Sequence, residues 1–189
     1  MREATGIIPA RYGATRFPGK PLAPIAGKPM IQRVYESAKR SRNLHRLLIA
    51  TDDERIRAAC RVFGAEVQMT SPHHRSGTER AVEVAKNLTS PIVINIQADE
   101  PLITGEAIDA LIQALQEENL PVATLAARVE DSVNFADPNR VKVVMDTEGN
   151  ALYFSRAPIP YRPGGHFWQH IGVYGYQRDF LLKFPNLPA

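Results

Sequence analysis

The stretch Ile92-Val93-Ile94-Asn95-Ile96-Gln97 is apolar at every position but Asn95 and the closing Gln97. Such a run suits a strand that is buried on both faces, as the strands of parallel sheets are. Similar runs, rich in β-branched residues, occur at 5–9, 47–51, 65–69 and 122–127. Helix-like stretches separate the runs, and this alternation favours a mostly parallel sheet flanked by helices. The expected fold class is therefore α/β and Rossmann-like.

The stretches between these runs carry helix signals. Pro29 suits the first position of a helix whose apolar face extends to Ala38. Asp52 or Asp53 can cap a second helix that ends near Gly64. Two further helices are predicted, one from the apolar stripe over 108–115 and a short one over 178–184.

Composition limits the class of protein. The chain has 189 residues, 44% of them apolar, and its 23 Lys and Arg against 20 Asp and Glu give a charge of +3. This length suits one globular domain, and the charge is too small to indicate a nucleic-acid partner. The single cysteine, Cys60, excludes an intramolecular disulfide and is expected to be a small buried hydrophobe. We expect a soluble, cytoplasmic protein with neither a signal peptide nor a membrane span.

The pattern changes after Pro138. Two short apolar runs, 141–145 and 151–154, flank Thr-Glu-Gly-Asn at 147–150, which has a turn composition. This arrangement predicts a β-hairpin. An exposed loop is expected at 158–165, which holds three prolines and two glycines, and one more strand is expected at 171–176. Residues 138–176 are therefore an additional hairpin region.

The segment IIPARYGATRFPGKPL, Ile7–Leu22, carries the strongest chemical signal. A buried strand opens there into a loop that contains two glycines and the cations Arg11, Arg16 and Lys20. Cations and flexible backbone amides at the end of a strand make a cradle for polyphosphate. The glycine spacing matches neither the Walker A loop nor the dinucleotide fingerprint. From composition alone, a solvated basic loop is an equally good interpretation.

Two more segments suggest a ligand site. Asp99 follows the strand at 92–97, at the edge of an open sheet where ligands bind, and its carboxylate suits Mg²⁺. Its alternative role is a helix cap. Residues 76–80, Ser-Gly-Thr-Glu-Arg, can form a helix start that offers amides to a ligand, or an ordinary cap with Glu79 and Arg80 in solvent. His166 and His170 have a spacing seen in zinc sites, but no second ligand pair accompanies them, so zinc is not expected.

Several blocks carry a family resemblance through nearly the whole chain. They are the loop Ile7–Leu22, ATDDERI (50–56), MTSPHHRSGTER (69–80), INIQADEPLI (94–103), DPNRVKVVMD (137–146), ALYFSRAPIP (151–160) and HIGVYGY (170–176). In this order they resemble the CTP:3-deoxy-manno-octulosonate (Kdo) cytidylyltransferase family.

The resemblance implies roles for individual residues. Asp99 matches the Mg²⁺ ligand of the family, and Arg11 and Lys20 join it as catalytic residues that bind the phosphates, with Arg16 sharing that work. Cytosine recognition is implied for Arg75, Ser76, Gly77 and Thr78. The glutamine at 97 lies between nucleotide and sugar acid in the family, and the sugar-acid ligands match Arg156, His170 and Tyr174. One departure is Ala98, where the family usually has glycine; the added methyl group lowers affinity if this position needs a positive φ or close ligand approach.

The implied reaction is attack of the Kdo anomeric hydroxyl on the α-phosphorus of CTP, which gives CMP-Kdo and pyrophosphate for lipopolysaccharide synthesis. The implied protein is a cytoplasmic homodimer. The family continues beyond this chain, normally with a second acidic Mg²⁺ ligand in a GVDTPEDL-like block, so residues 1–189 are expected to be a single nucleotidyltransferase domain without that segment. Reduced activity and some exposed apolar surface are expected to follow.

Three alternatives remain at this point. A cytidylyltransferase for another sugar acid, such as sialic acid or an amino derivative of Kdo, would share the nucleotide blocks, although HIGVYGY and FSRAPIP favour Kdo. A truncated protein that binds CTP with little activity would account for the missing metal ligand. A Rossmann-like dehydrogenase is disfavoured, because the first loop lacks the glycine spacing that such an enzyme needs.

Overall fold

A computed structural model describes residues 3–13, 17–130, 133–161 and 165–187. The chain forms two compact units. The first contains the residues up to Ala123 together with those from Val173 onward, and the second is Thr124–Gly172. Each is described in turn.

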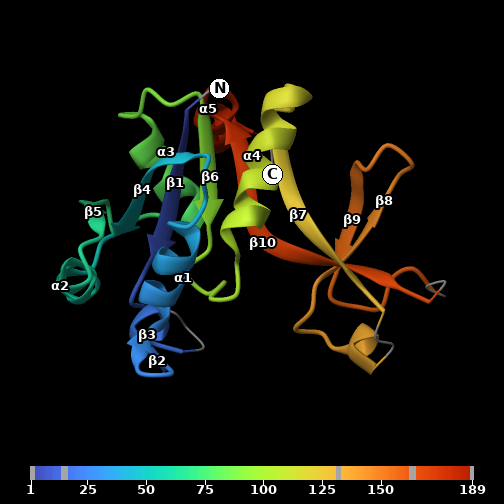
Figure 1. Cartoon of the computed structure of the whole chain (residues 1–189), viewed down its shortest axis with the longest axis horizontal. Coiled ribbons are helices and arrows are strands. Elements are labelled where there is room, and N and C mark those ends of the chain that lie inside the picture. The colour runs from blue at the N-terminus through green and yellow to red at the C-terminus, as the bar shows by residue number, and fades with distance from the viewer. Residues whose placement is uncertain (1–2, 14–16, 131–132, 162–164, 188–189) are drawn as a thin grey trace. The chain divides into compact units, whose positions relative to one another are not determined.

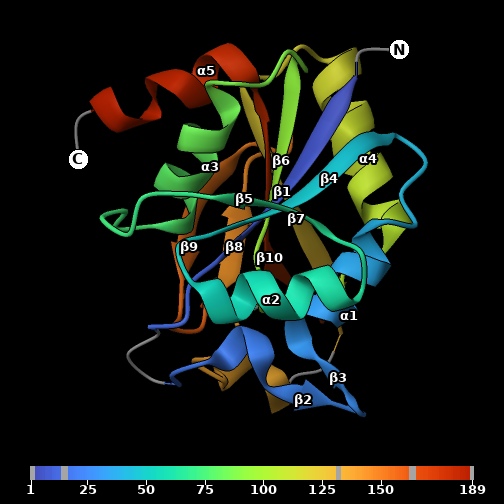
Figure 2. The same cartoon turned by 90° about the vertical axis from the view of Figure 1, so that its left-hand side faces the viewer.

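The first unit is built on a sheet with the strand order β5-β4-β1-β6-β10 (Figures 1 and 2). Its strands are β1 (Ala4–Ala10), β4 (Leu44–Thr51), β5 (Glu66–Met69), β6 (Ile92–Ile96) and the end of β10 (Phe167–Gln177). Pairing is parallel from β5 to β6, whereas β10 runs antiparallel to β6. Every residue of β1 and β6 is buried, which confirms the interpretation of the run at 92–96 as a strand covered on both faces.

Helices cover both faces of this sheet. They are α1 (Met30–Ala38), α2 (Glu54–Val62), α3 (Gly77–Ala85), α4 (Gly105–Glu117) and α5 (Arg178–Lys183). Figure 2 shows α3 and α5 on one side of the sheet and α1 and α4 on the other. The short elements η1 (Lys20–Leu22), β2 (Pro24–Ile25), β3 (Lys28–Pro29) and η3 (Phe184–Asn186) complete the unit.

Local sequence explains where these helices begin. Asp53, Ser76 and Thr104 each accept a hydrogen bond from a backbone N–H of the first helical turn, so the three side chains are N-caps. Pro29 precedes the first residue of α1. Cys60 of α2 is fully buried and its pKa is raised to about 12 by desolvation, which confirms that it is a buried hydrophobe.

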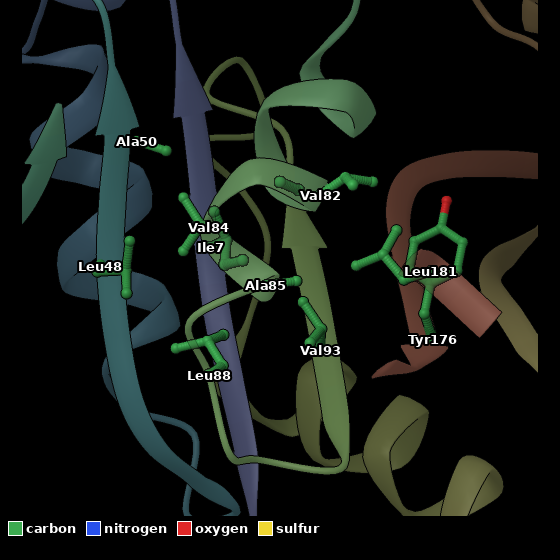
Figure 3. Packing of buried hydrophobic residues seen from close by; sticks show 11 residues of the cluster. Ile7, Leu48, Ala50, Val82, Val84, Ala85, Leu88, Val93, Tyr176 and Leu181 are labelled. Atoms are coloured by element: carbon green, nitrogen blue, oxygen red, sulfur yellow. The ribbon is translucent and has the colours of Figure 1, made fainter. Parts of the chain in front are cut away.

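The core between the sheet and helices α3 and α5 is aliphatic apart from Tyr176 (Figure 3). Ile7 of β1, Leu48 of β4 and Val93 of β6 come from the sheet, and Val84 and Leu181 come from the helices. All five side chains are fully buried. Burial of each such side chain contributes about 1.5–3 kcal/mol to the free energy of folding. This core fixes α3 against the strands, and with it the start of α3 at the end of the sheet.

The second unit contains β7 (Val122–Val129) from Thr124 onward, η2 (Val133–Ala136), β8 (Lys142–Met145), β9 (Ala151–Ser155) and the beginning of β10. Antiparallel pairing of β8 with β9 confirms the predicted hairpin. Its turn is held by Asp146, whose Oδ1 accepts from the N–H groups of Glu148 and Asn150, and by Gly149 at a φ of 87°. Trp168 of β10 lies opposite Val143 of β8.

The predicted α/β fold with flanking helices and an added hairpin is confirmed. One strand is longer than the sequence indicates, since β10 begins at Phe167 rather than at Ile171. Across the part of the chain that the structure describes, no helix has both the length and the apolarity to cross a membrane.

Candidate functional site

A cavity of about 460 Å³ opens in the first unit at the carboxyl ends of β1 and β6. Open α/β sheets bind ligands at this edge. The chain reaches the cavity from β1 at Arg11, from β6 at Gln97, and from the start of α3 at Ser76. Its lining is Pro9, Ala10, Arg11, Phe17, Lys20, Pro21, His74, Arg75, Ser76, Gly77, Arg80, Gln97, Ala98 and Asp99. Most of the predicted nucleotide-site residues are therefore in one place.

One wall of the cavity is charged. The Lys20 Nζ lies 2.5 Å from the Asp99 Oδ2, and both side chains keep a third to a half of their exposure. The loop that presents Lys20 turns at Gly19, whose φ is 73° and whose N–H donates to the Tyr12 carbonyl at 2.8 Å. A side chain at 19 would also lie about 3.1 Å from the Tyr12 ring. Glycine is therefore needed here on two counts.

The opposite wall is the start of α3. Ser76 caps the helix by accepting from the Glu79 N–H at 3.1 Å, and the Glu79 carboxylate accepts in return from the Arg75 N–H at 2.8 Å. A Cβ atom at Gly77 would lie 3.0 Å from the Pro9 ring, so the missing side chain lets α3 approach the end of β1 closely. Helix N-terminal amides at this position favour an anionic or polar ligand.

Gln97 and Thr78 meet through Asn95. The Gln97 Nε2 lies 3.5 Å from the Asn95 Oδ1, and the Asn95 Nδ2 lies 3.4 Å from the Thr78 Oγ1. Asn95 is fully buried and is the single polar residue within β6. Gln97 lines the cavity, whereas Thr78 is hydrogen-bonded to the buried Asn95 and is not part of the lining.

Arg80 and His74 are lining residues that sequence reasoning missed. An interpretation that leaves Arg80 in solvent is wrong, because this residue is 3% exposed. Its guanidinium donates to the Thr70 hydroxyl and pairs with Asp52 at 3.2 Å. The His74 imidazole is paired with Glu83 of α3, and this pairing lowers the pKa of Glu83 against the opposing effect of burial. The only sequence signal for Arg80 was its place one helical turn after the cap Ser76.

Among the described residues, Asp99 is the one acidic residue in the cavity lining. Among the residues that the structure describes, no cluster of three or more His, Cys, Asp or Glu could hold a metal by itself. Mg²⁺ takes one or two protein carboxylates and completes its shell with phosphate oxygens and water. A single accessible carboxylate that already attracts a cation, the Lys20 ammonium, fits that chemistry.

Ala98 also lines the cavity. Among the described non-glycine residues, only Ala26 and Asn119 have a positive φ, so alanine is not strained at 98. Any effect of its methyl group is confined to close approach of a ligand.

The predicted sugar-acid residues fall in both units. In the second unit, Arg156 donates from its NH1 to the Pro138 carbonyl at 2.9 Å, and the His170 Nε2 lies 3.0 Å from the Thr124 Oγ1. Burial lowers the pKa of His170, so its imidazole is neutral near pH 7. Tyr174, in the first unit, stacks on Tyr176, and burial raises its pKa. Arg16 lies outside the described residues.

Comparison with known proteins adds independent information. The sequence model of the cytidylyltransferases matches residues 5–188. A 3-deoxy-manno-octulosonate cytidylyltransferase from Solibacter usitatus is 50% identical, with all of this chain aligned to 77% of the relative. The corresponding protein of Geobacter sulfurreducens is 46% identical over 97% of this chain and 80% of its own length.

Solved structures agree. A CMP:2-keto-3-deoxy-manno-octonic acid synthetase complexed with CTP superimposes with a TM-score of 0.91 at 44% identity, covering 99% of this chain and 79% of the other. A cytidylyltransferase from Leptospira borgpetersenii, 16% identical with a TM-score of 0.64, covers all of this chain and 66% of its own, and shares the fold.

Proposed function

Because this chain belongs to the cytidylyltransferase family, among the 3-deoxy-manno-octulosonate cytidylyltransferases, we propose that it transfers CMP from CTP to Kdo and releases pyrophosphate. The observation that carries the proposal is the cavity at the ends of β1 and β6. It combines a cationic loop, a single carboxylate and an open helix start. The CMP-Kdo formed would serve lipopolysaccharide synthesis.

The phosphates are assigned to the cationic wall. The anomeric hydroxyl of Kdo attacks the α-phosphorus, and the bond from that phosphorus to the pyrophosphate oxygen breaks. Negative charge grows on the departing pyrophosphate, and Arg11 and Lys20 are placed to balance it, with Arg16 assigned a share of this work. No covalent intermediate on the protein is needed. Catalysis is therefore mainly positioning and charge neutralisation.

Asp99 would hold Mg²⁺ beside these cations. When bound, the metal supplies Lewis-acid neutralisation of the triphosphate oxygens. The Lys20 ammonium has three N–H donors, so it can keep its hydrogen bond of 2.5 Å to Asp99 and still donate to a phosphate. The Lys20–Asp99 pair thus keeps both groups at the cavity.

Base recognition is assigned to Arg75, Ser76, Gly77 and Thr78. Cytosine presents acceptors at O2 and N3 and a donor at N4, and the amides at the start of α3 can meet the acceptors. Gln97 offers both a donor and an acceptor at the cavity lining, which suits a residue between nucleotide and sugar.

The sugar acid is assigned to Arg156, His170 and Tyr174 together with Gln97. A guanidinium suits the carboxylate of the sugar acid because it can bind two oxygens at once. A neutral imidazole at His170 can accept a hydrogen bond from a sugar hydroxyl or donate one to it.

A cytoplasmic homodimer is part of the same proposal. The dimer is supported by exposed apolar side chains on β9, where Leu152 (66% exposed) and Phe154 (40%) share one face of the strand and Tyr153 (64%) lies on the other. Exposed apolar patches of this kind are typical of interfaces.

Pyrophosphate release by the purified chain tests the function. The reaction contains CTP, Mg²⁺ and Kdo, with omission of each in turn and with sialic acid or amino-Kdo in place of Kdo. We expect release that requires all three components and is fastest with Kdo. Faster release with another sugar acid would reassign the acceptor. Binding of CTP with no release would reduce the protein to a nucleotide-binding one.

A further inference from the structure

Arg80 is the most deeply buried charged group in the cavity lining. Its side chain is 4% exposed, although the residue lines the space assigned to the nucleotide. Removing a guanidinium from water is costly unless its donors and its charge find partners. The identity of those partners indicates what Arg80 does.

The partners come from the ends of two strands. Asp52 directly follows β4 and lies 3.2 Å from the Arg80 NH2. Thr70 directly follows β5, and its hydroxyl accepts from NH1, which also lies 3.4 Å from the Ser71 carbonyl. Arg80 itself is in the first turn of α3. One side chain thus ties the ends of β4 and β5 to the helix whose start forms a wall of the cavity.

The segment that this tie controls is the connection from β5 to α3. It begins at Thr70 and reaches the cavity at His74, Arg75 and Ser76. Glu83 holds the same connection by accepting from the Ser71 N–H at 3.0 Å and by pairing with His74. Both anchors lie on α3, but Arg80 alone of the two lines the cavity and reaches the sheet.

We propose that Arg80 is a positioning residue for nucleotide binding, which holds the 70–76 connection so that its last residues can contact the base. Its NH1 donates to the Thr70 hydroxyl and its charge is matched by Asp52, so the role proposed for it is to hold the wall rather than to bind a phosphate. This inference rests on the proposed function only for the identity of the nucleotide, CTP.

The test is CTP binding, measured by calorimetry without a sugar acid. Arg80→Met is expected to weaken CTP binding by about tenfold or more, the effect of losing one or two charged hydrogen bonds. Arg80→Lys, which keeps a charge beside Asp52, should recover part of that loss. Thr70→Val removes the hydroxyl that accepts from Arg80 and leaves the Arg80 side chain itself unchanged. This substitution should weaken CTP binding by about threefold. In turnover, the KM for CTP should rise while the KM for Kdo stays within about twofold.

Arg178 provides a matched control. It also donates to backbone carbonyls, from Nε to Ala85 at 3.0 Å and from NH2 to Lys86 at 3.5 Å, but at the opposite end of α3. Arg178→Met should lower the thermal midpoint and leave CTP affinity unchanged. A purely structural Arg80 would give the same result as this control.

The outcomes separate cleanly. If folded Arg80→Met binds CTP within about twofold of the parent, the proposal is overturned. If that variant does not fold, Thr70→Val and Arg80→Lys decide in the same way. A parent chain that binds CTP but releases no pyrophosphate with Kdo contradicts the sugar-acid assignment alone. A parent chain that does not bind CTP contradicts both.

Discussion

Lys20 is the residue whose removal most directly tests the charged wall. Its ammonium pairs with Asp99 at 2.5 Å and lines the cavity beside Arg11. We expect Lys20→Ala to lower kcat/KM by the equivalent of about 2 to 4 kcal/mol, the usual effect of losing one preorganised charge-stabilising group. Steady-state pyrophosphate release measures the change. Lys28→Ala, which breaks an ion pair with Glu36 away from the cavity, is the control. Turnover near that of the parent would remove Lys20 from the catalytic set.

Lys142 of β8 has an unusual environment. It is fully buried, and its ammonium donates to the carbonyls of Asp137, Arg140 and Arg156 at 2.7–2.9 Å. Burial lowers its pKa. We expect Lys142→Met to lower the free energy of unfolding by about 3 kcal/mol, because three partly buried carbonyls lose their donor. Urea denaturation measures this difference.

The exposed Lys86 serves as the control for Lys142, since Lys86→Met should change the urea midpoint little. Equal, small effects of the two substitutions would show that the carbonyls around position 142 find other donors.

His170 gives a pH-dependent prediction. Burial lowers its pKa below the usual 6.5, so the unfolded chain takes up the proton first as the pH falls. The contribution to stability is therefore complete above about pH 6.5 and is lost as the pH drops toward the folded-state pKa. His170→Gln should flatten the fall in unfolding free energy below pH 6.5, by at most about 1.4 kcal/mol per pH unit. Parallel pH profiles of the two proteins would contradict this.

Individual residues were predictable where their position in the chain fixed their surroundings. Lys20 lies in the loop that follows the first predicted strand, and Asp99 follows the strand predicted at 92–97. The structure brings both residues to the cavity. Arg80 and Lys142 were not predictable, because charged side chains are normally exposed. The groups that bury them lie elsewhere in the chain, such as Asp52 for Arg80 and the Arg156 carbonyl for Lys142.

At the scale of elements, helix α4 approaches the connection between α1 and β4 very closely. A Cβ atom at Gly105 would lie 2.6 Å from backbone atoms of Arg40 and Ser41. Glycine to alanine in a helix usually stabilises by up to about 1 kcal/mol. Here we expect Gly105→Ala to destabilise by about 1 to 3 kcal/mol, because backbone must move. Thermal denaturation gives the sign directly.

Ala110→Gly, at an exposed position near the middle of the same helix, is the control and should show the ordinary loss of about 1 kcal/mol. A stabilised Gly105→Ala variant would mean that the connection at 40–41 yields easily.

Helices were predictable where their apolar residues form a stripe, and strands were predictable where apolar residues form a continuous run. The stripes of α1 and α4 and the buried runs of β1 and β6 gave the helices and strands. The early start of β10 was missed because residues 167–170 follow a loop rich in proline and glycine and alternate weakly. Their burial depends on partners distant in sequence. For example, the ring centroids of Phe167 and Phe135 lie 5.3 Å apart.

At the scale of the whole molecule, the alternation of strands and helices predicted the α/β class, and the change of pattern after Pro138 predicted an additional hairpin region, whereas the boundaries of the two units had no sequence signal. Unit boundaries usually fall in exposed linkers, where composition changes. Here they fall at Ala123 and Val173, within the strands β7 and β10. A strand that passes from one unit to the other has the same apolar composition on both sides of the boundary.

Trp168 lies in the second unit, on β10 beside the hairpin, and it is the only tryptophan of the chain. The chain therefore contains its own optical label for that unit, whereas circular dichroism in the far ultraviolet is dominated by the helices of the first. If the strands that cross the boundary make unfolding a single transition, tryptophan emission and ellipticity will change at the same urea concentration. An emission change at lower urea would reveal that the hairpin region melts first, with the nucleotide cavity still folded.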